Sequence, residues 1–314
     1  MENAELQKNI LATVTYYDCL DYPLTAFEIW KYLFKISNFK FQIPNEKKKF
    51  SPLDIMEELE SDKLKKFVSE KRGFYFLRNR DGLVGQRIER NKIAEKKYRT
   101  LLGAVKWLRF VPYVRMVAVT GRMAMKNTES KSDLDLLIIL KHGKIFTGRL
   151  LVTGLVHFLG KRRYKNKIAD RICLNYFLTT QSLEITHKDI FSSSEYFFIL
   201  PVFGFRMFRK FQMKNGWIGN YKENFSLEEI PDLKMVRDGR FSKIIRKIGE
   251  KILNFDIIEK KLRSWQVRRI VNDPRTSQKG SMIIADDEML IFWPEPQSPK
   301  VFDKFQNRLE ELKV

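Results

Sequence analysis

The chain has 314 residues, and its 59 Lys and Arg residues outnumber 38 Asp and Glu residues, which gives a formal net charge of +21. Such a length is enough for two or three domains, and a composition with 44% hydrophobic and 13% aromatic residues excludes a mainly disordered chain. The charge predicts a polyanionic partner, such as nucleic acid, nucleotide phosphates or an anionic membrane surface.

The cysteine count and the apolar runs predict the cellular compartment of the protein. Two cysteines cannot build a disulfide framework, which favours a reducing compartment. The N-terminal residues show no apolar stretch of the secretory type, and the longest apolar runs are too short to cross a bilayer. We therefore expect a cytoplasmic protein without a membrane span.

Residues 1–85 are predicted to form a winged-helix-like unit. An apolar helical pattern opens the chain. Thr25 followed by Glu28 is a capping-box pattern, and Ser51 precedes a proline at a favoured helix start. Residues 35–50 are polar and basic and are expected to form a loop. Two short apolar stretches around a glycine turn then predict a hairpin, so three helices precede a β-hairpin as in a winged helix.

Residues 86–200 are predicted to form a mixed-sheet domain with a long leading helix. That helix is expected over residues 86–110 and ends before Pro112. A second helix is predicted over residues 146–160. Strands alternating with helices indicate a mixed sheet covered by helices, and the expected strands span residues 113–120, 133–140 and 172–178.

Residues 201–314 are predicted to form a basic, mainly helical region. The residues from Ser192 onward are expected to be helical until Pro201 and Gly204. Two basic helices are then expected over residues 241–255 and 257–270. A short strand over residues 289–293 and a final helix follow. The fold class predicted for the whole chain is therefore α+β.

Two carboxylates dominate the chemistry that the sequence suggests. Asp133 and Asp135 lie two residues apart at the start of a predicted strand, and residues with this spacing point to the same face of a strand. Carboxylates so placed repel each other unless a hard cation binds them. Mg²⁺ is held by a few carboxylates together with substrate phosphates, and metals of this kind assist phosphoryl and nucleotidyl transfer. We therefore expect Mg²⁺ or Mn²⁺ at this pair.

A phosphate-binding turn is predicted just upstream. The first strand of the domain ends at Thr120-Gly121, and residues 122–125 are expected to open a short helix. Glycine allows close approach of the backbone to a ligand, and helix-start N–H groups favour phosphate. The order of strand, glycine, helix, loop and carboxylate pair fits a nucleoside triphosphate with Mg²⁺.

These residues resemble the nucleotidyltransferase superfamily of the DNA polymerase beta type. The signature of that superfamily is an apolar strand, a small residue pair with glycine, about a dozen residues, and an acidic–hydrophobic–acidic triplet that begins a strand. Here Thr120-Gly121 matches the first half and residues 132–136 match the second. The resemblance implies metal binding by Asp133 and Asp135 and triphosphate binding around Gly121 and Ser132. The whole chain more loosely resembles prokaryotic proteins that pair a winged-helix segment with such a domain.

The sequence departs from the superfamily pattern in two places. Arg122 stands where Ser or Gly is usual, and an arginine can also meet a phosphate. The third carboxylate that active members carry on a later strand is absent, because the predicted strand offers Cys173, Asn175 and Phe177 on one face. Asn175 is the weak third metal ligand that this strand provides, and Asp170 just before it is a substitute.

Three hypotheses follow, and the first is an enzyme. It would move a nucleoside monophosphate from a nucleoside triphosphate to an acceptor hydroxyl, with nucleic acid or a protein as acceptor, and Asp133 and Asp135 as catalytic residues. The expected nucleotide-binding residues are Thr120, Gly121, Arg122, Lys126, Lys131 and Ser132.

The second hypothesis is a catalytically degenerate nucleotidyltransferase-like protein that acts as a basic nucleic-acid-binding or regulatory module. Twelve basic and three acidic residues lie within 86–131, beside the expected site, and nineteen basic and nine acidic residues lie within 204–280. The third hypothesis is peripheral attachment to a membrane through the basic C-terminal helices. The oligomeric state does not follow from the sequence.

Overall fold

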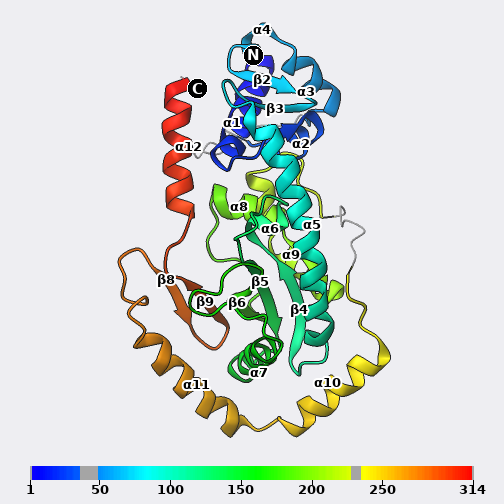
Figure 1. Cartoon of the computed structure of the whole chain (residues 1–314), viewed down its shortest axis with the longest axis vertical. Coiled ribbons are helices and arrows are strands. Elements are labelled where there is room, and N and C mark those ends of the chain that lie inside the picture. The colour runs from blue at the N-terminus through cyan, green and yellow to red at the C-terminus, as the bar shows by residue number, and fades with distance from the viewer. Residues whose placement is uncertain (1, 36–48, 228–234, 313–314) are drawn as a thin grey trace.

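The computed structural model describes residues 2–35, 49–227 and 235–312. Most of the loop expected at residues 35–50 lies outside these ranges. Figure 1 shows a small N-terminal unit at one end, a central sheet, and two helices, α10 and α11, along the opposite end. No helix within the described residues is long and apolar enough to cross a bilayer.

In residues 2–35 and 49–77, four helices and a three-stranded antiparallel sheet build the N-terminal unit. The capping boxes at Thr25 with Glu28 and at Ser51 with Asp54 are both formed, which confirms these helix starts. The sheet has the order β1-β3-β2, and β1 and α4 were not predicted. The elements are α1 (Glu2–Cys19), β1 (Leu24–Thr25), α2 (Ala26–Lys31), α3 (Pro52–Leu59), α4 (Asp62–Lys65), β2 (Val68–Lys71) and β3 (Phe74–Leu77).

The long helix α5 (Gly82–Leu108) runs from the N-terminal unit along the central sheet (Figure 1). It begins four residues earlier than predicted and ends before Pro112, as predicted. Leu101 and Leu108 on its inner side are fully buried in the core of the sheet domain. The helix therefore connects the two parts of the molecule and covers one face of the sheet.

The central sheet is mixed and has six strands in the order β7-β4-β5-β6-β9-β8. Only β5 and β6 pair in parallel, and α7 (Ile145–Phe158) connects them. Mixed α+β architecture is thus confirmed. The strands are β4 (Val114–Val119), β5 (Leu134–Leu140), β6 (Ile172–Thr179), β7 (Leu200–Phe203), β8 (Met282–Ala285) and β9 (Met289–Trp293).

The stretch predicted to stay helical up to Pro201 is instead a helix followed by a strand. Helix α8 (Ile190–Phe197) ends early, and β7 then pairs antiparallel with β4 at the sheet edge, where Leu200 faces Val119. A proline is tolerated there because an edge strand leaves one side unpaired. At the other edge, β8 was not predicted and pairs with the expected β9. The sheet therefore extends across the boundary that we expected between residues 200 and 201.

Strand β5 is buried on both faces, as its continuous apolar run predicted. Leu136 and Ile138 pack into the layer formed with α5 and α7. Leu137 and Ile139 pack on the opposite side, against α8 and α9 (Phe205–Lys214). By alternation, Asp135 belongs to the face that α8 covers.

The C-terminal residues form three further helices. They are α10 (Arg240–Ile252), α11 (Asp256–Val271) and α12 (Ser298–Leu312). Helix α12 returns to the N-terminal unit (Figure 1). There Phe305 meets the ring of Tyr16 edge-on. The last helix of the chain thus packs against the first one within the N-terminal unit.

Candidate functional site

The carboxylate pair lies where β5 begins, beside the turn that follows β4. The backbone N–H of Thr120 donates to the carbonyl of Asp135 at 3.1 Å, which fixes the turn against the strand. Gly121 follows with a φ of +63°, and a Cβ placed there would lie 3.3 Å from Oδ2 of Asp135. Gly121 therefore brings its backbone directly against the Asp135 carboxylate and begins the short helix α6 (Gly121–Ala124).

Strand β6 supplies the neighbours on the other side. Cys173 pairs in register with Asp135, and Nδ2 of Asn175 donates to Oδ1 of Asp135 at 2.9 Å. One ligand atom each from Asp133, Asp135 and Cys173 lies within 4.8 Å of the others. This partly buried triad could hold a metal ion. Cys173 and Asn175 lie beside the carboxylate pair, but Phe177, which was predicted to share their face, packs in the opposite layer because the pairing of β5 with β6 shifts register between Asp135 and Leu137.

Arg163 is a site residue that the sequence did not indicate. It lies in the irregular segment between α7 and β6, and its Nη1 donates to Oδ2 of Asp133 at 2.6 Å. The same nitrogen lies 3.7 Å from the sulfur of Cys173. Its guanidinium therefore offsets the charge of one carboxylate of the pair.

Burial, and after it neighbouring negative charge, raises the pKa values of two groups in the site. Burial, and next the charge of Asp133, raise the pKa of Asp135 to about 6, although Cys173, Arg163 and Asn175 act in the opposite direction. Burial, and then the charges of Asp135 and Asp133, raise the pKa of the Cys173 thiol to about 12. A bound cation would relieve this repulsion.

Glu195 of α8 is the second residue that the sequence did not indicate. Its carboxyl accepts a hydrogen bond from the backbone N–H of Gly121. Burial, followed by the charges of Asp135 and Asp189, raises its pKa to about 8. The carboxyl of Glu195 thus occupies the backbone N–H of Gly121, where we expected a phosphate. The sequence contains one signal for Glu195, because it is the single acidic residue of α8 and the other residues of this helix are apolar or small.

Two of the predicted phosphate ligands point away from the carboxylates. Nη1 of Arg122 lies 3.6 Å from Oε1 of Glu129 in the following loop. Nζ of Lys126 lies 2.8 Å from Oε1 of Glu95 on α5. Both side chains are half-exposed, so each could leave its partner for a ligand at a small cost.

The remaining predicted residues surround the loop before β5. Lys97 of α5 is buried, and its ammonium donates to the carbonyls of Ser130 and Ser132 and pairs with Asp170 at 2.9 Å. Oγ of Ser132 accepts from the backbone N–H of Glu129 at 3.2 Å. In the described part of the chain, Asn175 rather than Asp170 therefore contacts the carboxylate pair. Thr120 is buried, and Lys131 is exposed on the same loop.

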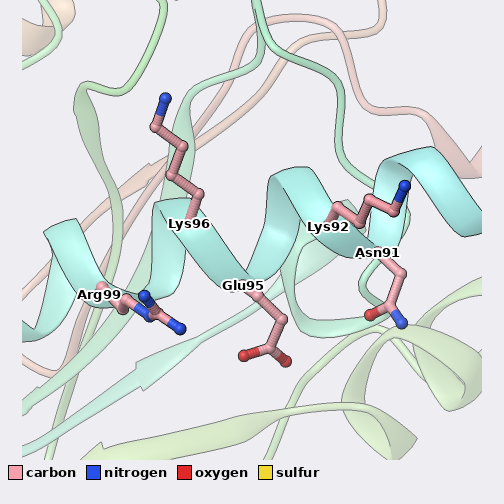
Figure 2. Close-up of a pocket in the computed structure, with 5 residues that line it drawn as sticks. All are labelled: Asn91, Lys92, Glu95, Lys96 and Arg99. Atoms are coloured by element: carbon pink, nitrogen blue, oxygen red, sulfur yellow. The ribbon is translucent and has the colours of Figure 1, made fainter.

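A surface hollow lies elsewhere, on the outer side of α5. Its lining residues are Asn91, Lys92, Glu95, Lys96 and Arg99 (Figure 2). Figure 2 shows their side chains spreading to different sides of the helix rather than converging on one point. None of them belongs to the carboxylate cluster, so we assign no ligand to this hollow.

Arg163 competes with a cation for Asp133, which gives a first prediction. Arg163→Gln should tighten Mn²⁺ binding about fivefold, because a half-exposed ion pair is worth on the order of 1 kcal/mol. Titration calorimetry measures the affinity. Lys165→Gln removes the same charge from the same segment at an exposed position and should change the affinity less. Equal effects of the two substitutions would show that only net charge matters.

Comparisons of the chain with protein-family models, with curated proteins and with solved structures find no match. The resemblance to the nucleotidyltransferase superfamily therefore rests on the motif residues alone. The chemical role of Asp133 and Asp135 must follow from their own geometry and electrostatics.

Proposed function

We propose that the chain is a divalent-cation-dependent nucleotidyltransferase. It would bind a nucleoside triphosphate at Asp133 and Asp135 and move the nucleoside monophosphate to an acceptor hydroxyl, with a nucleic acid or a protein as acceptor. The observation that carries this proposal is the convergence of both carboxylates and Cys173 within 4.8 Å, directly beside Gly121.

The donor set fits a hard cation. Two carboxylates and the amide oxygen of Asn175, once that amide turns from its present hydrogen bond, are the oxygen ligands that Mg²⁺ and Mn²⁺ prefer. The raised pKa of Asp135 shows that its charge is incompletely compensated by Arg163 and Asn175. The thiol of Cys173 is a soft ligand and adds little for either of these metals.

The reaction balances without any redox partner. The acceptor oxygen forms a bond to the α-phosphorus, the bond from that phosphorus to the bridging oxygen breaks, and pyrophosphate leaves. The acceptor's proton passes to water. The bound cation would supply positive charge to the triphosphate and to the leaving oxygen. Asp133 and Asp135 would hold that cation, and Gly121 would let phosphate oxygens approach the backbone.

A second function is favoured by the way the site groups satisfy one another. Arg163 binds Asp133, Asn175 binds Asp135, and Glu195 accepts from the amide of Gly121. In this reading the domain no longer turns over a nucleotide, and the chain acts as a basic nucleic-acid-binding or regulatory module. Its net charge of +21 supports that role.

For the N-terminal unit, which was predicted to be winged-helix-like, we propose a packing role. Its third helix, α3, carries three acidic residues, Asp54, Glu57 and Glu58, which disfavours contact with phosphates. The first and last helices of the chain bury Tyr16 and Phe305 against each other at this unit. These contacts support attachment of the unit to the rest of the chain.

A label-transfer assay tests the proposed activity. The protein is incubated with triphosphates labelled at the α-phosphate, Mg²⁺ or Mn²⁺, and total cellular RNA and protein. We expect wild-type transfer, and loss of transfer to background in Asp133→Asn with Asp135→Asn, because the cation loses both charged ligands. The matched control is Asp303→Asn with Glu310→Gln, which removes two exposed carboxylates from α12.

The outcomes separate the two functions. Transfer that survives in the Asp133 and Asp135 variant contradicts the site assignment. Nucleic-acid binding by the wild type without any transfer favours the binding module instead. Loss of transfer in the α12 control as well would indicate a general effect of charge rather than a metal site.

A further inference from the structure

Helix α10 turns its polar side toward the protein. Ser242 and Arg246 are the buried residues of this helix. Arg246 binds both carboxylate oxygens of Asp238, at 2.9 and 2.7 Å, and Glu250 receives both terminal nitrogens of Arg115, at 2.8 and 2.9 Å. Contacts of Arg246 with the backbone carbonyl of Arg109 and of Glu250 with Arg115 therefore attach the polar side of α10 to the rest of the protein.

The apolar side of the same helix faces solvent. Phe241, Ile244, Ile248 and Ile252 follow one another at spacings of three and four residues and are 70, 55, 54 and 63% exposed. Residues at this spacing form one stripe along a helix. Surface helices usually bury such a stripe in the core. We call these four residues the apolar ridge.

The ridge continues at both of its ends. Beyond α10, Phe255 and Ile257 are exposed at the start of α11. At the other end, Phe241 meets the ring of Phe110 edge-on, and Phe110 in turn contacts the exposed Trp107 at the end of α5. Extended apolar surface of this kind marks an interaction site in a folded protein.

A row of cations lies beside the ridge. Arg240, Lys243, Lys247 and Lys251 are all exposed. At 100° per residue they occupy a band along one flank of the ridge. The single acidic residue of α10, Glu250, is bound by Arg115 on the inner side. The outer surface of the helix thus combines apolar side chains with positive charge alone.

We propose that α10 lies in the surface of an anionic lipid bilayer. The apolar ridge would enter the boundary between headgroups and acyl chains, and the lysine row would meet the acidic headgroups. Long lysine side chains reach the headgroup level while their stems stay beside the apolar stripe. The chain would lie on the membrane without crossing it.

Two other occupants fit the surface less well. A second copy of the chain would bring two rows of lysines together in an assembly whose chains each carry +21. Nucleic acid would satisfy the lysines but would leave the four ridge side chains against phosphates and water. An anionic bilayer is the partner that matches both the charge and the apolar surface.

Vesicle flotation tests this proposal and does not depend on the proposed activity. Wild-type protein should float with vesicles of phosphatidylglycerol and phosphatidylcholine and much less with phosphatidylcholine alone. Ile244→Ser with Ile248→Ser should lower the partition coefficient at least about tenfold, because two apolar side chains no longer enter the bilayer. The matched control is Leu53→Ser with Met56→Ser on α3, which removes two equally exposed apolar side chains from the opposite end and should bind as the wild type does.

A charge variant separates the two contributions. Lys243→Gln with Lys247→Gln should lower the preference for anionic vesicles, whereas the same two substitutions at Lys260 and Lys261 on α11 should weaken it less. Circular dichroism checks that each variant is folded.

Four results would overturn the proposal. They are absence of wild-type flotation, equal flotation with neutral vesicles, wild-type flotation of the Ile244 and Ile248 variant, and equal loss in the α3 control. Light scattering supplies a further one. The wild type could prove to be a dimer that binds no vesicles and that the two isoleucine substitutions convert into a monomer. That result would show that a second copy of the chain covers the ridge.

Discussion

An alanine at position 204 is expected to destabilise the fold by on the order of 4 kcal/mol, among the largest effects of any single substitution. Gly204 joins β7 to α9 with a φ of +84°, and a Cβ there would lie 2.1 Å from the carbonyl oxygen of Arg115 and 2.8 Å from Cα of Met116. Both are backbone atoms of β4, so no side-chain rotation relieves the clash. Urea unfolding followed by circular dichroism measures the loss.

Gly143 provides the matched control for this prediction. It also has a positive φ, +73°, but a Cβ there would meet nothing within 4 Å. Gly143→Ala should therefore cost only the left-handed backbone strain, roughly 1–2 kcal/mol. Equal losses in the two variants would mean that close contact with β4 does not determine the effect at Gly204.

Gly204 directly follows β7, the strand that we wrongly predicted to be helical. Residues 199–203 form a short continuous apolar run, which fits a buried helix end as well as a buried strand. The run becomes a strand because it pairs with the edge of β4 that β5 does not use. By contrast, α7 and the strands β4, β5 and β6 are long or bounded by clear turn residues, and these were predicted correctly.

The same distinction applies to the candidate site. Asp133, Asp135 and Gly121 lie in one stretch of sequence. Strand alternation alone does not place Asn175, because the pairing of β5 with β6 shifts register between Asp135 and Leu137. Arg163 and Glu195 come from an irregular segment and from a separate helix, and only tertiary packing brings them to the carboxylates. Residues that complete a site from other elements carry no periodic signal in the sequence.

Lys222 is another residue whose environment only the fold reveals. Its side chain is fully buried between the N-terminal unit and the segment after α9. The ammonium nitrogen lies 3.3 Å from the ring centre of Phe34, and it donates to the hydroxyl of Tyr17 at 3.0 Å and to the carbonyl of Tyr32 at 3.3 Å. No carboxylate within the described residues pairs with it. Burial lowers the pKa of Lys222 well below its usual value.

Lys222→Met is expected to be more stable than the wild type near neutral pH, with an advantage that shrinks as pH rises. The unfolded chain holds a proton on Lys222 up to its ordinary pKa, but the folded chain releases it at lower pH. Folding in this window therefore releases a proton, and wild-type stability rises with pH by up to about 1.4 kcal/mol per unit. Methionine fills a similar volume and has no such proton, so the variant lacks that slope.

Urea unfolding of both proteins from about pH 7 to about pH 9 measures the difference between their free energies of unfolding. The contributions of the other titrating groups largely cancel in this difference. Lys279→Met, at an exposed loop position, is the control and should show no change of the difference with pH. A constant difference for Lys222→Met would mean that Lys222 stays protonated in the fold. The aromatic rings of Phe34 and Tyr17 would then compensate its buried charge, because ring faces attract a cation.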